Sequence, residues 1–199
     1  LVKGRVTGDL LERAIRYARE RHRLLERISA LSLTDELTGL HNRRAFMTMA
    51  DQRLQLLERS GALVMVVFAD VDDLKWTNDT RGHEAGDALI IAAAEALRST
   101  FRRTDLLARL GGDEFVALCE VSDEKAEELL LEKLQQQIAE RNVQEPTVPL
   151  SMSAGATSFR SGPGIRLQDL LAEADLRMLD RKNQRRSSRS RGLPPGTAG

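Results

Sequence analysis

The chain has 199 residues, 41% apolar but only 4% aromatic, which suits one domain of ordinary size with a mainly aliphatic core. Basic and acidic residues number 30 each, and this balance argues against nucleic acid or an anionic membrane as a partner. No apolar run reaches the ~20 residues that span a bilayer and no signal peptide opens the chain, so we expect a cytoplasmic protein.

Residues 8–33 are predicted to form one helix with a narrow apolar seam. Leu11, Ile15, Ala18, His22 and Leu25 recur at alternating four- and three-residue steps, and Ile28 and Leu31 continue the seam. Such a seam on an otherwise charged helix favours pairing with another helix. Packing of the helix against its own domain is the alternative.

The rest of the chain alternates between helices and strands. Helices are predicted over 43–59, 85–101, 123–142 and 167–182, and strands over 63–69, 106–110, 114–121 and 150–157. The run 63–69 is continuously apolar, which is typical of a strand buried on both faces. This order predicts an α/β fold with a mixed sheet. The tail from Ser187 is rich in Ser, Arg, Pro and Gly, and we expect it to be disordered.

Two carboxylates follow the apolar strand, at Asp70 and Asp72. Removing a charge from water is costly, and a bound divalent cation would offset that cost. Mg²⁺ takes oxygen ligands and usually bridges one or two protein carboxylates to substrate phosphates. An aspartate that caps a helix at a strand end is the alternative interpretation.

A second acidic segment follows a glycine turn, in Gly111-Gly112-Asp113-Glu114. Two glycines in a tight hairpin let a ligand approach the backbone closely. Successive strand residues point to opposite faces, so we expect only one of the two carboxylates to share a site with Asp70.

With these segments the sequence resembles the GGDEF family of diguanylate cyclases. The motifs that carry the resemblance are residues 33–44, residues 70–79, Gly82-His83, Gly86-Asp87, residues 109–115 and residues 151–155. They cover roughly residues 33–186 and occur in the family's order. The resemblance implies a nucleotidyl-cyclase-like mixed β-sheet surrounded by helices, with an N-terminal signalling helix.

The resemblance also divides the chain into three parts. Residues 1–32 are similar to the end of a response-regulator receiver domain followed by a linker helix, which implies two-component signalling. Residues 33–186 would be the cyclase domain, and 187–199 the disordered tail.

The family's reaction joins two GTP molecules into cyclic di-GMP and pyrophosphate. The resemblance implies that Asp70, the Val71 carbonyl and Asp113 hold Mg²⁺, with Mn²⁺ as an alternative cofactor. Asp113 would also accept the proton of the attacking 3′-hydroxyl, and Glu114 would complete the acidic site. Lys75 would contact the triphosphate and stabilise transition-state charge.

Asn78 and Asp87 are the residues that the resemblance assigns to the guanine edge. A carboxylate at Asp87 accepts from guanine N1–H and N2–H₂, donors that adenine does not offer at this edge, so ATP would leave it unpaired. Gly111 and Gly112 would leave room for the nucleotide.

Lys182 and Arg186 match the family's late basic pair, which reaches the phosphates. The chain departs from the family near this pair. Leu179 replaces the usual Tyr, Arg181 the usual Ala, and Arg185 the usual Gly. These departures put the phosphate contacts of the last helix in doubt.

The resemblance further implies a homodimer and feedback inhibition. One domain supplies one GTP half-site, so two copies are required, and the N-terminal helix is the natural place for pairing. Arg102 and Asp105 match the family's Arg-x-x-Asp site, where product binds as an inhibitor; an ordinary surface ion pair is the alternative.

Two other functions remain open. The chain could bind GTP or cyclic di-GMP without turnover, as a regulatory module, or it could accept ATP and make mixed dinucleotides. We expect Trp76 to be a packing residue and His83 to be structural.

Overall fold

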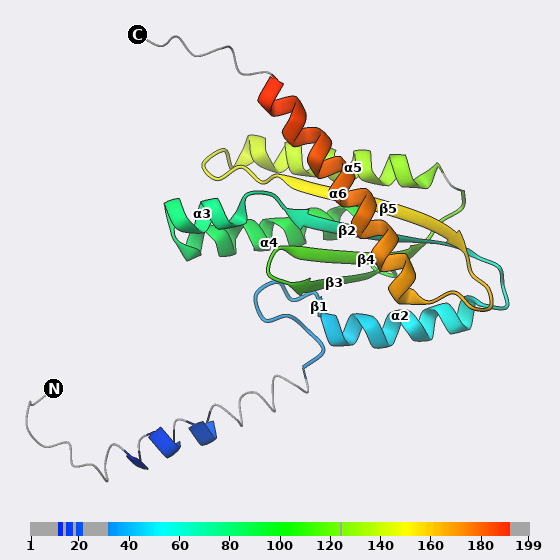
Figure 1. The fold of residues 1–199 in the computed structure, drawn as a ribbon, viewed down its shortest axis with the longest axis horizontal. Coiled ribbons are helices and arrows are strands. Elements are labelled where there is room, and N and C mark those ends of the chain that lie inside the picture. The colour runs from blue at the N-terminus through cyan, green and yellow to red at the C-terminus, as the bar shows by residue number, and fades with distance from the viewer. Residues whose placement is uncertain (1–11, 14, 18, 22–31, 124, 192–199) are drawn as a thin grey trace, which may run out of the picture. The chain divides into compact units, whose positions relative to one another are not determined.

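The computed structural model of the protein describes residues 12–13, 15–17, 19–21, 32–123 and 125–191. The sheet and the helices that cover it belong to one compact unit that begins at Thr34 (Figure 1). In chain order its elements are β1 (His41–Asn42), α2 (Arg43–Leu57), β2 (Leu63–Val71), α3 (Leu74–Arg81), α4 (His83–Thr100), β3 (Leu106–Gly111), β4 (Glu114–Glu120), α5 (Ala126–Gln144), β5 (Met152–Arg160) and α6 (Leu167–Arg191). No helix in the described part of the chain is both long and apolar enough to cross a lipid bilayer.

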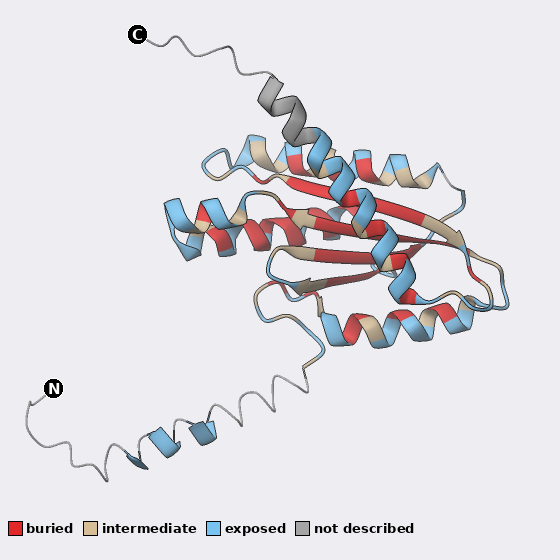
Figure 2. Ribbon diagram, in the orientation of Figure 1, coloured by how far each residue is buried: buried red, intermediate tan, exposed pale blue. Residues whose placement is uncertain are grey.

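β2 lies in the interior of a five-stranded sheet with the order β1-β3-β4-β2-β5. It pairs antiparallel with β4 and β5, β3 pairs antiparallel with β4, and β1 runs parallel to β3. The predicted α/β fold with a mixed sheet is therefore confirmed. Residues 63–69 are all buried, as expected for a strand covered on both faces (Figure 2).

Each face of the sheet packs against its own pair of helices. Met65 and Val67 of β2 join the core formed with α4 and α5, whereas Val64 and Val66 join the core formed with α2 and α6. Successive strand residues point to opposite faces, so one apolar strand supplies the centre of both cores.

The predicted helices and strands of this unit are all present, with most ends displaced by a few residues. The sequence does not predict α3, because this helix buries only Thr77 and so carries no apolar stripe. α6 continues to Arg191, past the predicted helix end at 182 and into the segment 187–199 that is expected to be disordered.

The predicted N-terminal helix lies largely outside the described residues. Residues 12–13, 15–17 and 19–21 are helical, whereas Ser32 and Leu33 are not. Most of the seam lies outside the described part: Leu11, Ala18, His22, Leu25, Ile28 and Leu31. The receiver-like residues 1–4 also lie outside it, so helix pairing and a preceding receiver domain stay predictions.

α6 crosses β5 at close range, and Gly155 makes this approach feasible. A Cβ atom at Gly155 would lie 2.2 Å from the Met178 backbone nitrogen and 2.5 Å from the Ala174 carbonyl oxygen. Both are backbone atoms, so a larger residue would push the helix away from the sheet. Gly155 thus fixes the height of α6 above β5 and, with it, the position of Lys182 further along the helix.

Gly155→Ala should lower the free energy of unfolding by about 1–3 kcal/mol, because the added methyl overlaps the α6 backbone. Gly162→Ala is the matched control, since its Cβ would meet no atom within 4 Å; we expect its effect to stay within ~0.5 kcal/mol. Urea unfolding followed by circular dichroism measures both. Equal losses in the two variants would contradict the close approach of α6.

Candidate active site

The candidate site lies where the C-terminal end of β2 meets the β3–β4 hairpin. Asp70 pairs with Glu114 in the antiparallel ladder, and the Val71 N–H donates to the Asp113 carbonyl oxygen at 3.0 Å. The two acidic segments singled out in the sequence are therefore adjacent in the fold.

Both hairpin carboxylates belong to this site, and the expectation that only one would share it with Asp70 is wrong. β3 ends at Gly111 and β4 begins at Glu114, so Asp113 lies in the turn, where strand alternation does not apply. Glu114 is directly opposite Asp70, and directly opposed residues of an antiparallel pair share a face.

The glycine turn leaves open space beside the carboxylates. Gly112 has a φ of 48°, in the left-handed region that favours glycine. A Cβ atom at Gly111 or Gly112 would have no neighbour within 4 Å. The turn is therefore exposed and unobstructed, as expected for a place where a ligand approaches the backbone.

Lys182 of α6 reaches into the acidic cluster. Its Nζ forms an ion pair with Asp70 Oδ1 and lies 3.9 Å from Asp72 Oδ1. Asp72 is held by two hydroxyls of the β5 segment: Ser151 Oγ donates to it at 2.7 Å and Ser153 Oγ at 2.8 Å. Asp72 therefore has partners from the protein, and Lys182 is paired mainly with Asp70.

Burial and neighbouring negative charges raise the pKa of Asp70 and of Glu114. Burial raises the pKa of Asp70, the charges of Asp113 and Asp72 add to that rise, and Lys182 opposes it. Burial also raises the pKa of Glu114, together with the charges of Asp113, Asp175 and Asp70, against a smaller effect of Arg43. The C-terminal end of β2 thus holds an excess of negative charge, and a bound cation would reduce the repulsion between the carboxylates.

The donor set suits a metal ion that brings further ligands with it. Among the described residues, no group of three or more His, Cys, Asp or Glu side chains could hold a metal by itself. Asp70, the Val71 carbonyl and Asp113 offer oxygen ligands only, and Mg²⁺ typically takes one or two carboxylates and completes its shell with water and phosphates. The residues present therefore fit Mg²⁺ that arrives with phosphate groups.

The predicted guanine-binding residues lie at the corner between α3 and α4. Gly82, with a φ of 86°, ends α3 and begins α4, and its N–H donates to the Asn78 carbonyl at 3.0 Å. The Asn78 amide lies against Gly86: a Cβ there would be 1.9 Å from Asn78 Oδ1. That oxygen is buried and has no hydrogen-bond partner, and the neighbouring Asp87 is exposed.

Two phosphate candidates remain, one on α3 and one on α6. Lys75 is exposed on α3, three residues before Asn78, so the two side chains share a helix face. Arg186 follows Lys182 by four residues on α6, but its side chain lies outside the described part of the chain.

Arg109 supports the hairpin turn, a role that the sequence did not suggest. Its Nε and Nη2 donate to the Gly112 carbonyl at 2.9 and 2.7 Å, and its Nη1 lies 3.3 Å from Asp35. Asp35 in turn accepts from the Thr38 hydroxyl at 2.7 Å and the Thr38 N–H at 2.9 Å. Burial would raise the pKa of Asp35, but the bonds from Thr38 and Arg109 together hold it below its ordinary value.

The candidate inhibitory residues form a turn between α4 and β3. The Arg102 N–H donates to Asp105 Oδ2 at 2.8 Å, and the Asp105 N–H donates to the Arg102 carbonyl at 3.0 Å. The Arg102 side chain is exposed. Arg53 of α2 holds this loop by donating to the Thr104 carbonyl at 2.6 Å and to Glu120 at 2.9 Å.

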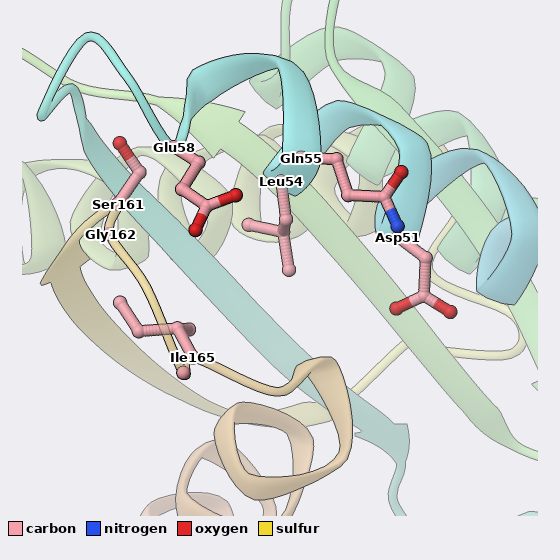
Figure 3. A pocket seen from close by; sticks show the side chains of 8 residues that line it. Asp51, Leu54, Gln55, Glu58, Ser161, Gly162 and Ile165 are labelled. Atoms are coloured by element: carbon pink, nitrogen blue, oxygen red, sulfur yellow. The ribbon is translucent and has the colours of Figure 1, made fainter.

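Several cavities are lined by the described residues, and they differ in their relation to the acidic cluster. One of about 150 Å³ lies between α2 and the loop after β5, and none of the predicted site residues lines it (Figure 3). A larger one of about 570 Å³ lies beside α3 and α5 and includes Asp72 and Trp76 in its wall. Trp76, which was expected to be a packing residue, is 59% exposed and belongs to neither buried core.

Glu114→Gln should stabilise the fold at pH 7 by a few tenths to about 1 kcal/mol, because it removes a repelled, partly buried charge. The folded-state pKa of Glu114 lies above its ordinary value of 4.5. The gain should therefore be complete above the raised pKa and disappear as the pH falls below that ordinary value, where both states are protonated.

Thermal unfolding of this variant between pH 4 and 8 provides the measurement. Glu95→Gln, at an exposed position of α4, controls for the loss of a charge alone. A gain that is independent of pH, or a loss of stability at pH 7, would refute the electrostatic account.

Comparison with known proteins agrees with this geometry. The family model described as diguanylate cyclase, GGDEF domain, matches residues 32–188. The probable diguanylate cyclase DgcJ of Escherichia coli K12 is 36% identical over 171 residues, which cover 84% of this chain and 33% of that protein. The diguanylate cyclase DgcP of Pseudomonas aeruginosa is 39% identical over 140 residues, which cover 69% of this chain and 21% of that protein.

The chain thus spans a third or less of these two relatives' own length. Among solved structures, the GGDEF domain of DgcB from Caulobacter crescentus, in complex with c-di-GMP, superposes with a TM-score of 0.69 at 26% identity and covers 77% of this chain and 91% of that chain. The family match covers most of the sequence and the fold is shared. The chain belongs to the GGDEF family of diguanylate cyclase domains.

Proposed function

We propose that this domain is an active diguanylate cyclase, which condenses two GTP molecules into cyclic di-GMP and releases pyrophosphate. The proposal rests on one observation: Asp70, Val71 and the Asp113 turn are adjacent where β2 ends and β4 begins, beside Lys182. The family membership and the printed activities of the relatives support it.

Asp113 would take the proton of the attacking hydroxyl. The 3′-oxygen of one GTP forms a bond to the α-phosphorus of the other, the bond to the bridging oxygen breaks, and pyrophosphate leaves. A second, reciprocal step closes the ring. Mg²⁺ held by Asp70, the Val71 carbonyl and Asp113 would stabilise the charge that develops on the phosphate oxygens.

The basic residues would bind the triphosphate from two sides. Lys75 approaches from α3, and Lys182 with Arg186 from α6. The substitutions at Leu179 and Arg185 leave both basic residues of α6 in place, one helical turn apart.

Asn78 and Asp87 would select guanine. The buried amide oxygen of Asn78 has no partner in the protein, and turning it toward a guanine donor would remove the cost of leaving it unpaired. Asp87 follows Gly86 in α4 and is exposed, so its carboxylate would accept from N1–H and N2–H₂.

The reaction requires a homodimer in this proposal. One chain offers one set of carboxylates and one guanine corner, so the second GTP must be presented by a second copy. The N-terminal helix is the candidate pairing element. A receiver domain before it would place the cyclase under two-component control.

Two alternatives share the same site. A module that binds GTP or cyclic di-GMP without turnover would keep the guanine corner but not the chemistry. A cyclase that accepts ATP would form mixed dinucleotides.

Incubation of the purified chain with Mg²⁺ and GTP, or with GTP plus ATP, followed by mass spectrometry of the products separates these functions. We expect cyclic di-GMP and no mixed dinucleotide. Asp113→Asn should lower the rate by at least about 100-fold, because it removes the proton acceptor. Asp123→Asn, at an exposed position before α5, should keep the wild-type rate. GTP binding without any product would favour the non-catalytic module.

We also propose that cyclic di-GMP inhibits the enzyme by binding at Arg102 and Asp105. The turn between them leaves the Arg102 side chain exposed, and Arg53 fixes the loop from α2. Within the described residues no ion pair joins the Arg102 side chain to Asp105, so the guanidinium is available for bidentate contacts with phosphate or guanine.

Arg102→Ala should raise the concentration of cyclic di-GMP that halves the rate by at least about tenfold, since hydrogen bonds to a charged group are lost. Each rate is compared with the same variant's uninhibited rate. Arg103→Ala, the exposed neighbour outside the motif, should leave inhibition unchanged. Inhibition that survives Arg102→Ala would exclude this site.

A further inference from the structure

We propose that Lys182 is the resting counter-ion of Asp70, and that it keeps a free divalent cation out of the site until nucleotide phosphates draw its ammonium away. This inference rests on the proposed function, because it assigns the order in which that site is filled.

The ion pair occupies the same carboxylate that is expected to ligate the metal. Lys182 Nζ contacts Asp70 Oδ1, and the two side chains are only 17% and 14% exposed. A cation that binds alone at Asp70 must displace this ammonium. The displaced charge would stay in a partly buried place without its main partner, which is costly.

Asp72, the neighbouring carboxylate, is not a free alternative partner for the displaced Lys182 ammonium. Asp72 already accepts hydrogen bonds from Ser151 at 2.7 Å and from Ser153 at 2.8 Å, and its nearest oxygen is 3.9 Å from Lys182. The ammonium therefore needs a new acceptor before it can leave Asp70, and the phosphate oxygens of a nucleotide provide one.

The helix that carries Lys182 is held against the sheet, so only the lysine side chain would move when its ammonium passes from Asp70 to a phosphate. Gly155 lets α6 lie directly on the β5 backbone, and a shift of the helix would open that contact. Lysine carries a point charge on a flexible stem, which suits a move between acceptors within one site. Metal and nucleotide would then bind cooperatively, because the phosphates would draw Lys182 from Asp70 and the metal would take its place at that carboxylate.

The test measures Mn²⁺ binding by electron paramagnetic resonance, without nucleotide and with 3′-deoxy-GTP, which lacks the attacking hydroxyl. Without nucleotide, Lys182→Gln should bind Mn²⁺ roughly five- to tenfold more tightly than the wild type. With 3′-deoxy-GTP the order should reverse, because the variant lacks the phosphate contact. Arg181→Gln, which removes a charge from the exposed adjacent position, should match the wild type in both conditions.

A merely structural lysine would weaken both kinds of binding, and Mn²⁺ affinity of Lys182→Gln equal to or below wild type overturns the proposal. If 3′-deoxy-GTP binds to neither protein, the cyclase function fails, and the metal-only comparison still decides the competition.

The wild-type protein supplies a reading that needs no folded variant. In NMR spectra of protein labelled with ¹⁵N-lysine, the side-chain Nζ resonance of Lys182 should shift when Mg²⁺ and 3′-deoxy-GTP are added together. It should not shift with the same concentration of Mg²⁺ alone. A shift with Mg²⁺ alone overturns the proposal.

Discussion

The antiparallel register between β2 and β4 is the constraint on which the candidate site depends. It sets Asp70 opposite Glu114 and brings the Asp113 turn beside Val71. Chain segments more than forty residues apart therefore supply one acidic cluster at the end of the two strands. A slip of one residue would place the Asp70 and Glu114 side chains on opposite faces of the sheet. The buried apolar residues of β2, which alternate between two cores, make such a slip costly.

The turn itself is held from outside the sheet. Arg109 joins the Gly112 carbonyl to Asp35, a residue that precedes the first strand, and Thr38 fixes Asp35 in turn. The hydrogen bonds from Thr38 and the charge of Arg109 explain why the pKa of Asp35 stays low despite burial. The opening loop of the domain therefore contributes to the position of the glycines although it supplies no candidate ligand.

Much of this arrangement could be predicted from the sequence. The apolar run of β2 and the glycine hairpin have strong local patterns. The resemblance to the family supplied the expected roles of the acidic residues, of the two residues at the guanine edge and of the basic residues. Three features could not be predicted. α3 has no apolar stripe, the place of Asp113 in the turn depends on where β4 begins, and the pairing of Lys182 with Asp70 depends on how closely α6 lies on Gly155. Each is decided by tertiary packing, which no short sequence pattern encodes.

The corner at Gly82 has a consequence for how this domain tolerates change in chain length. Asn78 and Asp87 lie on different helices that are separated by a single left-handed residue, and backbone bonds from Gly82 and Gly86 tie the corner together. One residue inserted within the helical turn on either side of Gly82 would rotate the residues of that helix by about 100° relative to the corner. The position of Asp87 relative to Asn78 would change with that rotation. In the proposed function, base selection would thus depend on the spacing of this corner as well as on the identity of its side chains.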